Sequence, residues 1–462
     1  MIRLFKHYIP HAVVLLWLVD VLLLALANET SWRLRADQIG IDPGALVDRL
    51  GAHAAFAAVI SLSMISVGVY GGDALRSKRF AAARLLVAIS LGIIALSFVD
   101  FLVGGQNFWR STLAYSMAFA IVLLVANRLL LGAFLGTSSF RRRVLVLGAG
   151  ARAQRLRALG ERPESGFAIV GYIAMSESAP VVVEEAITRA AIHNLTRYVE
   201  NLGVSEVVLA LEERRNALPL KDLLRIKTAG VHVNEFSSFL ERETGRVDLD
   251  TVNPSWLIFS DGFSSGRAIS SAAKRLFDMA VAALLLVVTA PVIALFALLV
   301  KIDSKGPAFY RQPRVGLFGE CFDVIKLRSM RTDAEVAGAQ WASKDDPRVT
   351  RVGRFIRKVR IDELPQAWTV LKGEMSFVGP RPERPEFVAD LEEQLRYYAE
   401  RHMVKPGITG WAQINYPYGA SIEDSRNKLE YDLYYAKNYT PFLDFLIILQ
   451  TLRVVLWSEG AR

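Results

Sequence analysis

Residues 274–300 read KRLFDMAVAALLLVVTAPVIALFALLV, a long apolar block with Pro291 near its middle. Basic residues flank the block on both sides: Lys274 and Arg275 before it, and Lys301, Lys305, Arg311 and Arg314 after it. Because basic flanks favour the cytoplasmic side of a membrane, both ends are expected on that side. Proline removes one helical hydrogen bond and bends the chain. We therefore predict a re-entrant helix over residues 274–301, kinked at Pro291, with a bent helix that crosses the membrane as the alternative.

Further apolar blocks precede this one, at residues 9–27, 52–70, 85–103 and 113–135. Each is about as long as a helix that crosses a bilayer, and their short connections predict antiparallel neighbours. The spans show no paired charges, although Asp20 and Asp100 lie near helix ends. Basic clusters after the second and fourth blocks place those ends, and the N-terminus, in the cytoplasm. The sequence predicts a four-helix transmembrane region over residues 1–140, acting as an anchor or as a transporting or sensing element.

The composition narrows the class of protein. Of the 462 residues, 52% are hydrophobic, and the formal net charge is +9. Excess cations suit nucleic acid, anionic lipid or phosphorylated substrates, and the membrane segments favour the last two. Cys321 is the only cysteine, which excludes an intramolecular disulfide and a cysteine-based metal site. The six histidines form no HExxH pattern, so a zinc hydrolase is not expected.

Residues 141–262 are predicted to form a soluble α/β domain. Strand candidates lie at residues 144–147, 169–173, 181–183, 206–211 and 231–236, and a helix at 218–229 ends at Gly230. This pattern is similar to a small Rossmann-like sheet. The segment GAGARA after the first strand has the spacing of a loop that cradles a pyrophosphate, but no acidic residue stands clearly at the end of the second strand to hold a ribose. Two interpretations of this domain therefore remain: a structural or regulatory sheet, and a cofactor-binding site.

The third predicted domain, residues 263–462, carries two adjacent carboxylates, Asp362 and Glu363, within RIDELPQAWTVLKGEMSFVGPRPE. Asp362 is predicted to be a helix N-cap, with Pro365 in the first turn and Gly373 at the helix end. A helix N-terminus keeps a carboxylate ionised, and a positioned carboxylate can act as a nucleophile. Glu363 beside it could share a divalent cation with it. Helix capping alone is the structural alternative.

Cations surround this segment in the sequence. A predicted strand presents Lys326 and Arg328 on one face, where they could grip a phosphate. Arg351, Arg354 and Arg357 recur every three residues and form a basic stripe on a predicted helix, which suits lipid headgroups or a lipid-linked phosphate. A solvated strand edge and a solvated helix face are the alternatives.

Two loops complete the candidate site. Arg381 lies between two prolines, so it is presented to a ligand with little backbone entropy left to lose. A glycine-rich loop over residues 401–415 offers Lys405 and Gln413 to a nucleotide or a sugar. Ordinary turn formation explains both loops equally well.

Taken together, these motifs resemble the bacterial sugar transferase family of monotopic phosphoglycosyl transferases over residues 273–457. In chain order after KRLFD, they read FYRQPRVG, KLRSM, RIDELPQ, GEMSFVGPRPE and KPGITGWAQIN. The regions ahead of them resemble the large subgroup, which includes undecaprenyl-phosphate glucose and galactose phosphotransferases. The resemblance implies a mainly helical catalytic domain that moves a sugar 1-phosphate from a UDP-sugar to undecaprenyl (polyprenyl) phosphate and releases UMP. This would be the initiating step of exopolysaccharide, capsule or O-antigen synthesis.

The resemblance also implies residue roles, a Mg²⁺ ion and a covalent phospho-sugar enzyme. Asp362 would be the nucleophile, and Glu363 would assist with the metal or with the incoming lipid phosphate. Lys326, Arg357 and Arg381 match family positions that hold phosphate.

The chain departs from the family pattern at two places. Ala290 replaces the serine of the family's Ser-Pro kink, so the proline is kept but a serine hydrogen bond is lost. Pro417 stands where some small members of the family carry an arginine that contacts the nucleotide sugar.

The partners expected on this basis are a UDP-sugar, polyprenyl phosphate and membrane lipid, with a homodimer suggested by the larger relatives and no nucleic acid. The expected location is the bacterial inner membrane, with the catalytic domain facing the cytoplasm. A membrane-anchored UDP-sugar dehydratase or epimerase is one rival, but the Tyr-x-x-x-Lys pair that it needs does not occur in the sequence. A non-enzymatic lipid-binding protein is the other.

Overall fold

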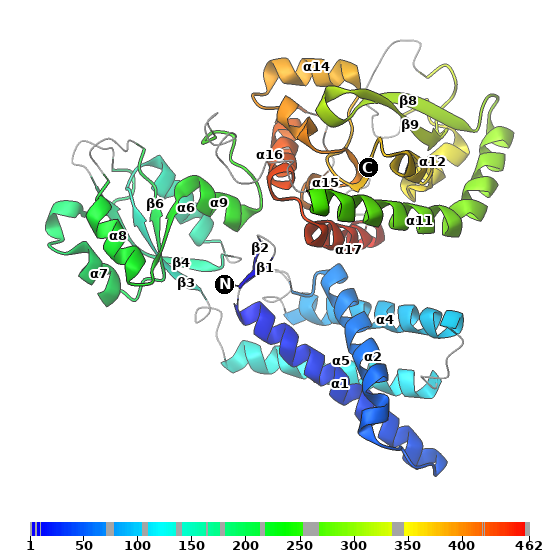
Figure 1. Ribbon diagram of the computed structural model, residues 1–462, viewed down its shortest axis with the longest axis horizontal. Helices are drawn as coiled ribbons and strands as arrows, with labels where there is room; N and C mark the ends of the chain where they lie inside the picture. The colour runs from blue at the N-terminus through cyan, green and yellow to red at the C-terminus, as the bar shows by residue number, and fades with distance from the viewer. Residues whose placement is uncertain are drawn as a thin grey trace. The chain divides into compact units, whose positions relative to one another are not determined.

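The chain, described by a computed structural model, divides into two compact units, residues 1–245 and 246–462 (Figure 1). The described residues are 2–4, 7–9, 11–70, 78–103, 110–134, 141–162, 165–175, 181–212, 218–252, 268–334, 346–417, 419 and 421–457. The predicted domain boundary at residue 262 lies outside them. Val247 and Val252, which the sequence analysis assigned to the α/β domain, pack in a hydrophobic core of the second unit.

The first unit begins with a short hairpin, β1 Ile2–Leu4 and β2 His7–Ile9, and continues with long apolar helices. These helices are α1 His11–Ile39, α2 Leu46–Val67, α4 Lys78–Val103 and α5 Arg110–Phe134. All four predicted helices are therefore present. Three contain stretches long and apolar enough to cross a membrane, and the described part of α4 has a shorter one. Helix α1 extends well beyond the predicted end at residue 27, because the polar turns that follow Ala27 still satisfy helical hydrogen bonds.

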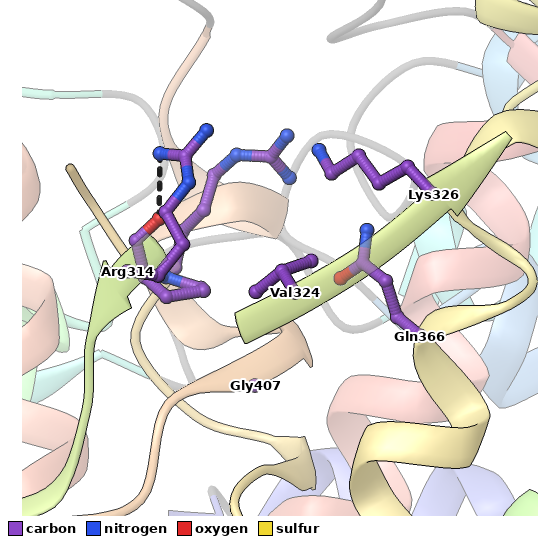
Figure 2. Close-up of a pocket in the computed structure, with 7 residues that line it drawn as sticks. Arg314, Val324, Lys326, Gln366 and Gly407 are labelled. Atoms are coloured by element: carbon purple, nitrogen blue, oxygen red, sulfur yellow. Dashed lines mark hydrogen bonds between the residues drawn. The ribbon is translucent and has the colours of Figure 1, made fainter. Parts of the chain in front are cut away.

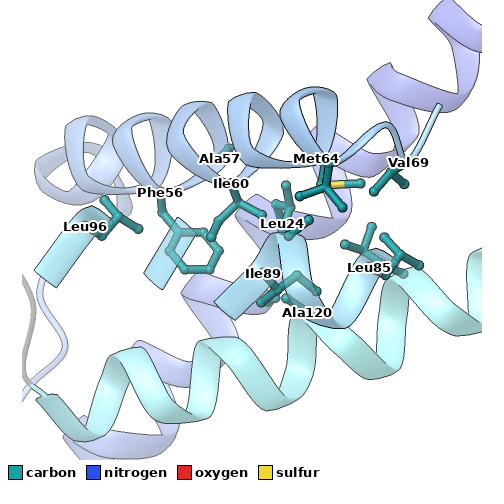
Figure 3. Close-up of a cluster of buried hydrophobic side chains, with 14 residues drawn as sticks. Leu24, Phe56, Ala57, Ile60, Met64, Val69, Leu85, Ile89, Leu96 and Ala120 are labelled. Atoms are coloured by element: carbon teal, nitrogen blue, oxygen red, sulfur yellow. The ribbon is translucent and has the colours of Figure 1, made fainter. Parts of the chain in front are cut away.

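A hydrophobic core holds these helices together (Figure 3). Phe56 and Ile60 of α2 are fully buried and lie among Leu24 of α1 and Ile89 of α4. A Cβ atom at Gly92 would collide with the side chain of Ile60, so this glycine allows α2 and α4 to approach closely. Small residues at helix contacts have this role in membrane bundles, where packing replaces the hydrophobic effect.

The bundle also contains a buried ion pair that the sequence analysis did not expect. Asp20 is fully buried and accepts hydrogen bonds from Arg128 at 2.7 and 3.0 Å, and from Asn127 and Tyr70 at 3.0 Å each. The expectation that the spans lack paired charges is wrong because the partner of Asp20 lies 108 residues away on α5. A pair of this kind ties α1 to α5, because separating the charges in an apolar medium is costly.

A second polar network connects the helices farther along α1. Glu29 pairs with Arg49 at 2.8 Å and with His53 at 2.9 Å. Asn28 contacts His53 at 2.9 Å and accepts a hydrogen bond from Ser116 at 2.9 Å. Three helices are thus linked by groups that have few other partners inside a membrane.

The rest of the first unit is a parallel sheet with helices on both faces. Its strands are β3 Arg142–Leu147, β4 Phe167–Ala174, β5 Ile187–Thr188, β6 Glu206–Leu209 and β7 His232–Glu235. Their order is β5-β4-β3-β6-β7, which confirms the Rossmann-like sheet. The predicted strand at residues 181–183 is wrong, because the Val182 and Val183 amides donate to the Ala149 carbonyl instead of to a neighbouring strand.

The helices of this domain are divided between the faces of the sheet by the side chains that they bury. They are α6 Ala151–Gly160, α7 Leu195–Asn201, α8 Leu220–Thr228 and α9 Phe236–Thr244, with the short turn η1 Arg189–Ala191. Helices α6 and α9 pack with Val144 and Val146 of β3, whereas α7 and α8 pack with Leu145 and Leu147. Alternate residues of a strand point to opposite faces, so β3 is the centre of both cores.

The GAGARA loop leads from β3 into α6, as predicted. A Cβ atom at Gly148, where φ is +135°, would collide with the carbonyl oxygen of Ala210, so this position requires glycine. The amide of Ala151 in the first turn of α6 donates to the Glu212 carboxylate at 2.7 Å. A helix N-terminus attracts anions, and here the anion belongs to the chain itself. This contact favours the structural interpretation of the loop over a pyrophosphate site.

The second unit is mainly helical in its described residues, with two small sheets. Its helices are α11 Ala268–Asp303, α12 Arg351–Lys358, α13 Gln366–Lys372, α14 Pro385–Gln394, α15 Trp411–Asn415, α16 Ile422–Asn438 and α17 Pro441–Trp457, with 3-10 turns η2 Leu317–Gly319, η3 Ile361–Glu363 and η4 Ala399–Met403. The antiparallel hairpin of β8 Phe309–Val315 and β9 Cys321–Leu327 is one sheet, and the parallel pair β10 Ser376–Val378 and β11 Gly407–Thr409 is the other.

Helix α11 contains Pro291 and is continuous across it. Proline removes a single hydrogen bond, and a bent helix keeps the others. The ribbon of α11 changes direction partway along its length in Figure 1. The Thr289 hydroxyl donates to the Leu285 carbonyl at 2.6 Å, a contact that favours bending of a helix. Thr289 therefore supplies a hydroxyl beside Ala290, where the family pattern has serine.

Both ends of α11 are fixed to the same unit. Near its start, Lys274 pairs with Asp444 of α17 at 2.6 Å, and Arg275 donates to the last carbonyls of α13 at 2.6 and 2.7 Å. Just beyond its end, Arg328, the residue after β9, donates to the Ser304 and Lys305 carbonyls at 2.8 and 2.7 Å. Several apolar side chains between these anchors are exposed, among them Leu284, Leu298 and Val287, which is 75% exposed.

Candidate active site

The two adjacent carboxylates lie in η3, a single turn between α12 and α13. The predicted N-cap role of Asp362 is wrong, because α13 begins at Gln366, with Pro365 in the capping position. Arg360 precedes the turn with φ of +57°, an uncommon conformation for a residue with a side chain. Helix α13 ends at Gly373, as predicted.

Glu363 is held by cations from three parts of the second unit. Its carboxylate accepts a hydrogen bond from Arg381 at 2.7 Å and lies 3.5 Å from Lys326 and 3.4 Å from Arg360. Burial raises the pKa of Glu363, but the charges of Arg381, Lys326 and Arg360 outweigh this effect and hold the pKa well below its usual range. Glu363 is therefore ionised, and it fixes the orientation of the cations around it.

Asp362 differs from its neighbour, because no hydrogen bond or ion pair to its carboxylate is found within the described residues. Burial and the adjacent Glu363 charge raise the pKa of Asp362 to about 6, against the lowering effects of Lys326, Arg357 and Arg381. Its oxygens are thus not engaged by donors of the described residues. A carboxylate in this state has its lone pairs available to a ligand or an electrophile.

Two ion-pair partners of Glu363, Lys326 and Arg381, also line a cationic pocket (Figure 2). Its lining residues are Arg314, Val324, Lys326, Gln366, Arg381, Pro382 and Gly407. Lys326 and Gln366 point toward the same space in Figure 2. Burial lowers the pKa of Lys326, and the Glu363 charge opposes this change. A cavity with three cations and one amide suits the oxygens of a phosphate or diphosphate.

Sequence reasoning identified Lys326 and Arg381 but did not assign a site role to Arg314 or Gln366. Arg314 donates to the Pro382 carbonyl at 3.1 Å and to the Gln312 side chain at 2.6 Å, so its guanidinium is held at the pocket wall. The signal was present, because both residues stand inside motifs that carry the family resemblance, FYRQPRVG and RIDELPQ.

The pocket wall depends on close contact between two loops. Strands β10 and β11 pair in parallel, and the residues that follow them touch through their backbones. Cβ atoms at Gly379 and Gly407 would collide with backbone atoms of the opposite loop. These glycines therefore have a packing role, which brings the Arg381 loop against the 401–415 loop.

Several predicted binding residues have other partners in the structure. Lys405 donates to the Gly373 carbonyl at the end of α13 at 2.7 Å, and Gln413 donates to the Ile408 carbonyl at 3.2 Å. Arg328, which is buried, caps the end of α11 as described above. None of these three lines the pocket, because carbonyl groups of neighbouring elements engage their polar ends.

The basic stripe of α12 is confirmed as a helix, but its members differ in position. Arg357, in the last turn, is close enough to lower the pKa of Asp362 by its charge. Arg354 is exposed, and the structure does not bring it into the pocket. Phe355 lies beside it, is 52% exposed and stacks on Phe296 of α11 with 5.8 Å between the ring centroids.

Asp362 and Glu363 are the carboxylates of the described site that a metal ion could bind. Within the residues that the structure describes, no group of three or more metal-ligating side chains occurs. Mg²⁺ is commonly held by one or two carboxylates together with substrate phosphates. The oxygens of Asp362, next to Glu363 and a pocket lined by three cations, fit that requirement.

Comparison with known protein families gives two matches along the chain. Residues 269–458 match the family described as bacterial sugar transferase, and residues 66–228 match a family described as CoA-binding domain. The first match contains all of α11 except its first residue, together with η3 and every pocket residue. The second contains most of the described α/β sheet.

Individual relatives agree with these matches. The chain is 42% identical over 240 residues to a UDP-N-acetylgalactosamine-undecaprenyl-phosphate N-acetylgalactosaminephosphotransferase of Aeromonas hydrophila, covering 52% of this chain and 56% of the relative. It is 33% identical over 361 residues to an undecaprenyl-phosphate glucose phosphotransferase of Komagataeibacter xylinus, covering 75% and 65%. It is 32% identical over 394 residues to a UDP-glucose:undecaprenyl-phosphate glucose-1-phosphate transferase of Xanthomonas campestris pv. campestris, covering 80% and 79%. The chain thus spans less than two thirds of the first two relatives.

Proposed function

This chain belongs to the bacterial sugar transferase family, and on that premise we propose that it transfers a sugar 1-phosphate from a UDP-sugar to undecaprenyl phosphate and releases UMP. The observation that carries the proposal is the free carboxylate of Asp362 beside a pocket of three cations. The names of the relatives support UDP-glucose and UDP-N-acetylgalactosamine as the first donors to test.

The reaction proceeds in two displacements at one phosphorus atom. A carboxylate oxygen of Asp362 attacks the phosphorus that bears the sugar, and the bond from this phosphorus to the bridging oxygen breaks. UMP leaves with the electron pair, and an aspartyl phospho-sugar remains. An oxygen of undecaprenyl phosphate then attacks the same phosphorus, the aspartyl–phosphorus bond breaks, and the carboxylate is restored.

The cations of the pocket assist both displacements. Lys326, Arg314 and Arg381 neutralise the negative charge that is spread over the phosphoryl oxygens. Glu363 holds Arg381 and Lys326 in place through its ion pairs. Mg²⁺, held by Asp362 and Glu363, would neutralise the diphosphate and stabilise the leaving group.

A two-step route suits substrates from different phases. The donor is soluble and the acceptor is embedded in lipid, so a covalent intermediate allows them to reach one carboxylate in turn. We assign binding of the undecaprenyl phosphate to Arg357. This residue lies on α12 together with the exposed Phe355, which stacks on Phe296 of α11.

The second unit would sit at the cytoplasmic face of the bacterial inner membrane, with α11 as a re-entrant helix. The contacts at both ends of α11 support this placement. Lys274 at its start and Asp303 at its end are bound by the same unit, Asp303 by accepting from the Val352 amide at 3.0 Å. A helix that crossed the bilayer would have its ends on opposite sides, whereas its exposed apolar middle suits insertion into one leaflet.

Release of UMP from a panel of UDP-sugars tests the proposal directly. The full chain in detergent or nanodiscs, with undecaprenyl phosphate and Mg²⁺, should release UMP from at least one donor. With donor alone, mass spectrometry should find the sugar phosphate on the peptide that contains Asp362. An active enzyme that never carries this mass would exclude the covalent route.

A further inference from the structure

A buried ion pair outside the pocket connects η4 with α16. Arg401 of η4 donates to the Asp432 carboxylate of α16 from two nitrogen atoms, at 3.0 and 2.7 Å. The side chains are only 5% and 4% exposed. Arg401 also donates to the Tyr398 hydroxyl at 3.0 Å. Neither Arg401 nor Asp432 lines the pocket or touches Asp362 or Glu363.

A further hydrogen bond of Arg401 connects it to the candidate active site. Its guanidinium donates to the backbone carbonyl of Arg381 at 2.9 Å, and the side chain of Arg381 donates to Glu363 at 2.7 Å. The contacts therefore form one chain, Asp432 to Arg401, Arg401 to the Arg381 carbonyl, and the Arg381 guanidinium to Glu363. Because Arg381 stands between two prolines, fixing its carbonyl also restricts the direction of its side chain.

Stability is a weak explanation for this pair. Moving two charges out of water costs several kcal/mol, and well-packed apolar residues often serve a protein equally well. Buried polar networks have a better attested role in fixing a single geometry. Arg401 keeps its charge, because Asp432 and Tyr398 raise its pKa against the lowering effect of burial. Apart from Asp432 and Tyr398, the group that Arg401 bonds to among the described residues is the backbone carbonyl of Arg381.

The geometry points to Arg401, locked by Asp432, as a positioning residue that aims Arg381 at the transferred phosphate. The inference rests on the proposed transferase function and adds residues to it that touch no substrate. Loss of the pair should leave the Arg381 guanidinium present but no longer aligned with Glu363 and the pocket. A misplacement of about 1 Å in such a group can cost about 100-fold in rate.

A double-mutant cycle on UMP release tests this role. Asp432→Asn alone should lower kcat/KM by about 10- to 100-fold at a temperature where the full chain is folded. In an Arg381→Ala background, the same change should lower kcat/KM by less than about 3-fold, because the group that it positions is already absent. A merely structural pair would give equal losses in both backgrounds, which would overturn the inference.

Matched variants control for folding. Glu430→Gln changes the neighbouring carboxylate of α16, which pairs with Arg246 at 3.3 Å and has no bond to the Arg381 loop, so kcat/KM should stay within about 2-fold. If Asp432→Asn does not fold, Arg401→Lys replaces it in the cycle, since lysine keeps the charge beside Asp432 but lacks the forked guanidinium. Absence of UMP release from the wild-type chain would instead refute the proposed function, and this outcome is distinct from equal losses in an active enzyme.

Discussion

Replacing Asp362 by asparagine should abolish activity and at the same time stabilise the second unit. The change is nearly isosteric and removes the nucleophilic oxygen, so UMP release should fall by at least about 10³-fold. No hydrogen bond to Asp362 occurs among the described residues, so no contact is lost. Burial and the Glu363 charge raise its pKa from 3.8 to about 6, which corresponds to at most about 3 kcal/mol of cost for keeping the group ionised at pH 7. Asparagine removes that cost.

The sign of the pH dependence follows from the same shift. Between pH 3.8 and about 6, the folded chain holds a proton at Asp362 that the unfolded chain has released, so the wild type loses stability as the pH rises through this window. The Asp362→Asn variant should lack this component.

Thermal unfolding of the full chain in chelator, followed at several pH values, measures both effects. Each kcal/mol corresponds to roughly 2–4 °C in Tm for a unit of this size. Asp390→Asn on the exposed face of α14 is the matched control and should change neither Tm nor turnover. A lower Tm for Asp362→Asn, or turnover near that of the wild type, would show that the carboxylate is a structural group and not the nucleophile.

Three further predictions concern the metal, the topology and the helical bundle. Chelator in excess over Mg²⁺ should stop UMP release and added Mg²⁺ should restore it, whereas release that continues in chelator would remove the metal from the reaction. Cys321, the sole cysteine and exposed on β9, should react with a membrane-impermeant maleimide only after the inner membrane is opened, and labelling of intact spheroplasts would contradict the re-entrant placement of α11. Asp20→Asn should destabilise the bundle by about 3 kcal/mol, because Arg128 stays buried without its charge partner. In that last case, Arg128→Gln added to Asp20→Asn should recover part of the loss in detergent unfolding, and a purely additive result would show that the two charges are not coupled.

Local patterns in the sequence predicted the long helices and most of the parallel strands, but not every element or its start. The apolar blocks predicted the bundle helices, since a span of that length has few other stable forms in lipid. Gly373 marked the end of α13, because its left-handed backbone ends a helix wherever it occurs. Helix α11 runs through Pro291 as one helix, since a proline inside a helix removes a single hydrogen bond and the others are kept.

The sequence by itself determined the chemistry of the site: two carboxylates at positions 362 and 363, and the motifs that bring Lys326 and Arg381 with them. Only the tertiary structure decided which cations reach the pocket. Arg328 has the same charge as Arg314, yet the carbonyls at the end of α11 engage it, whereas Arg314 lines the cavity. A side chain's role depends on the groups that distant segments place within about 3 Å of it, and those distances are set by packing between elements and not by the spacing of residues along the chain.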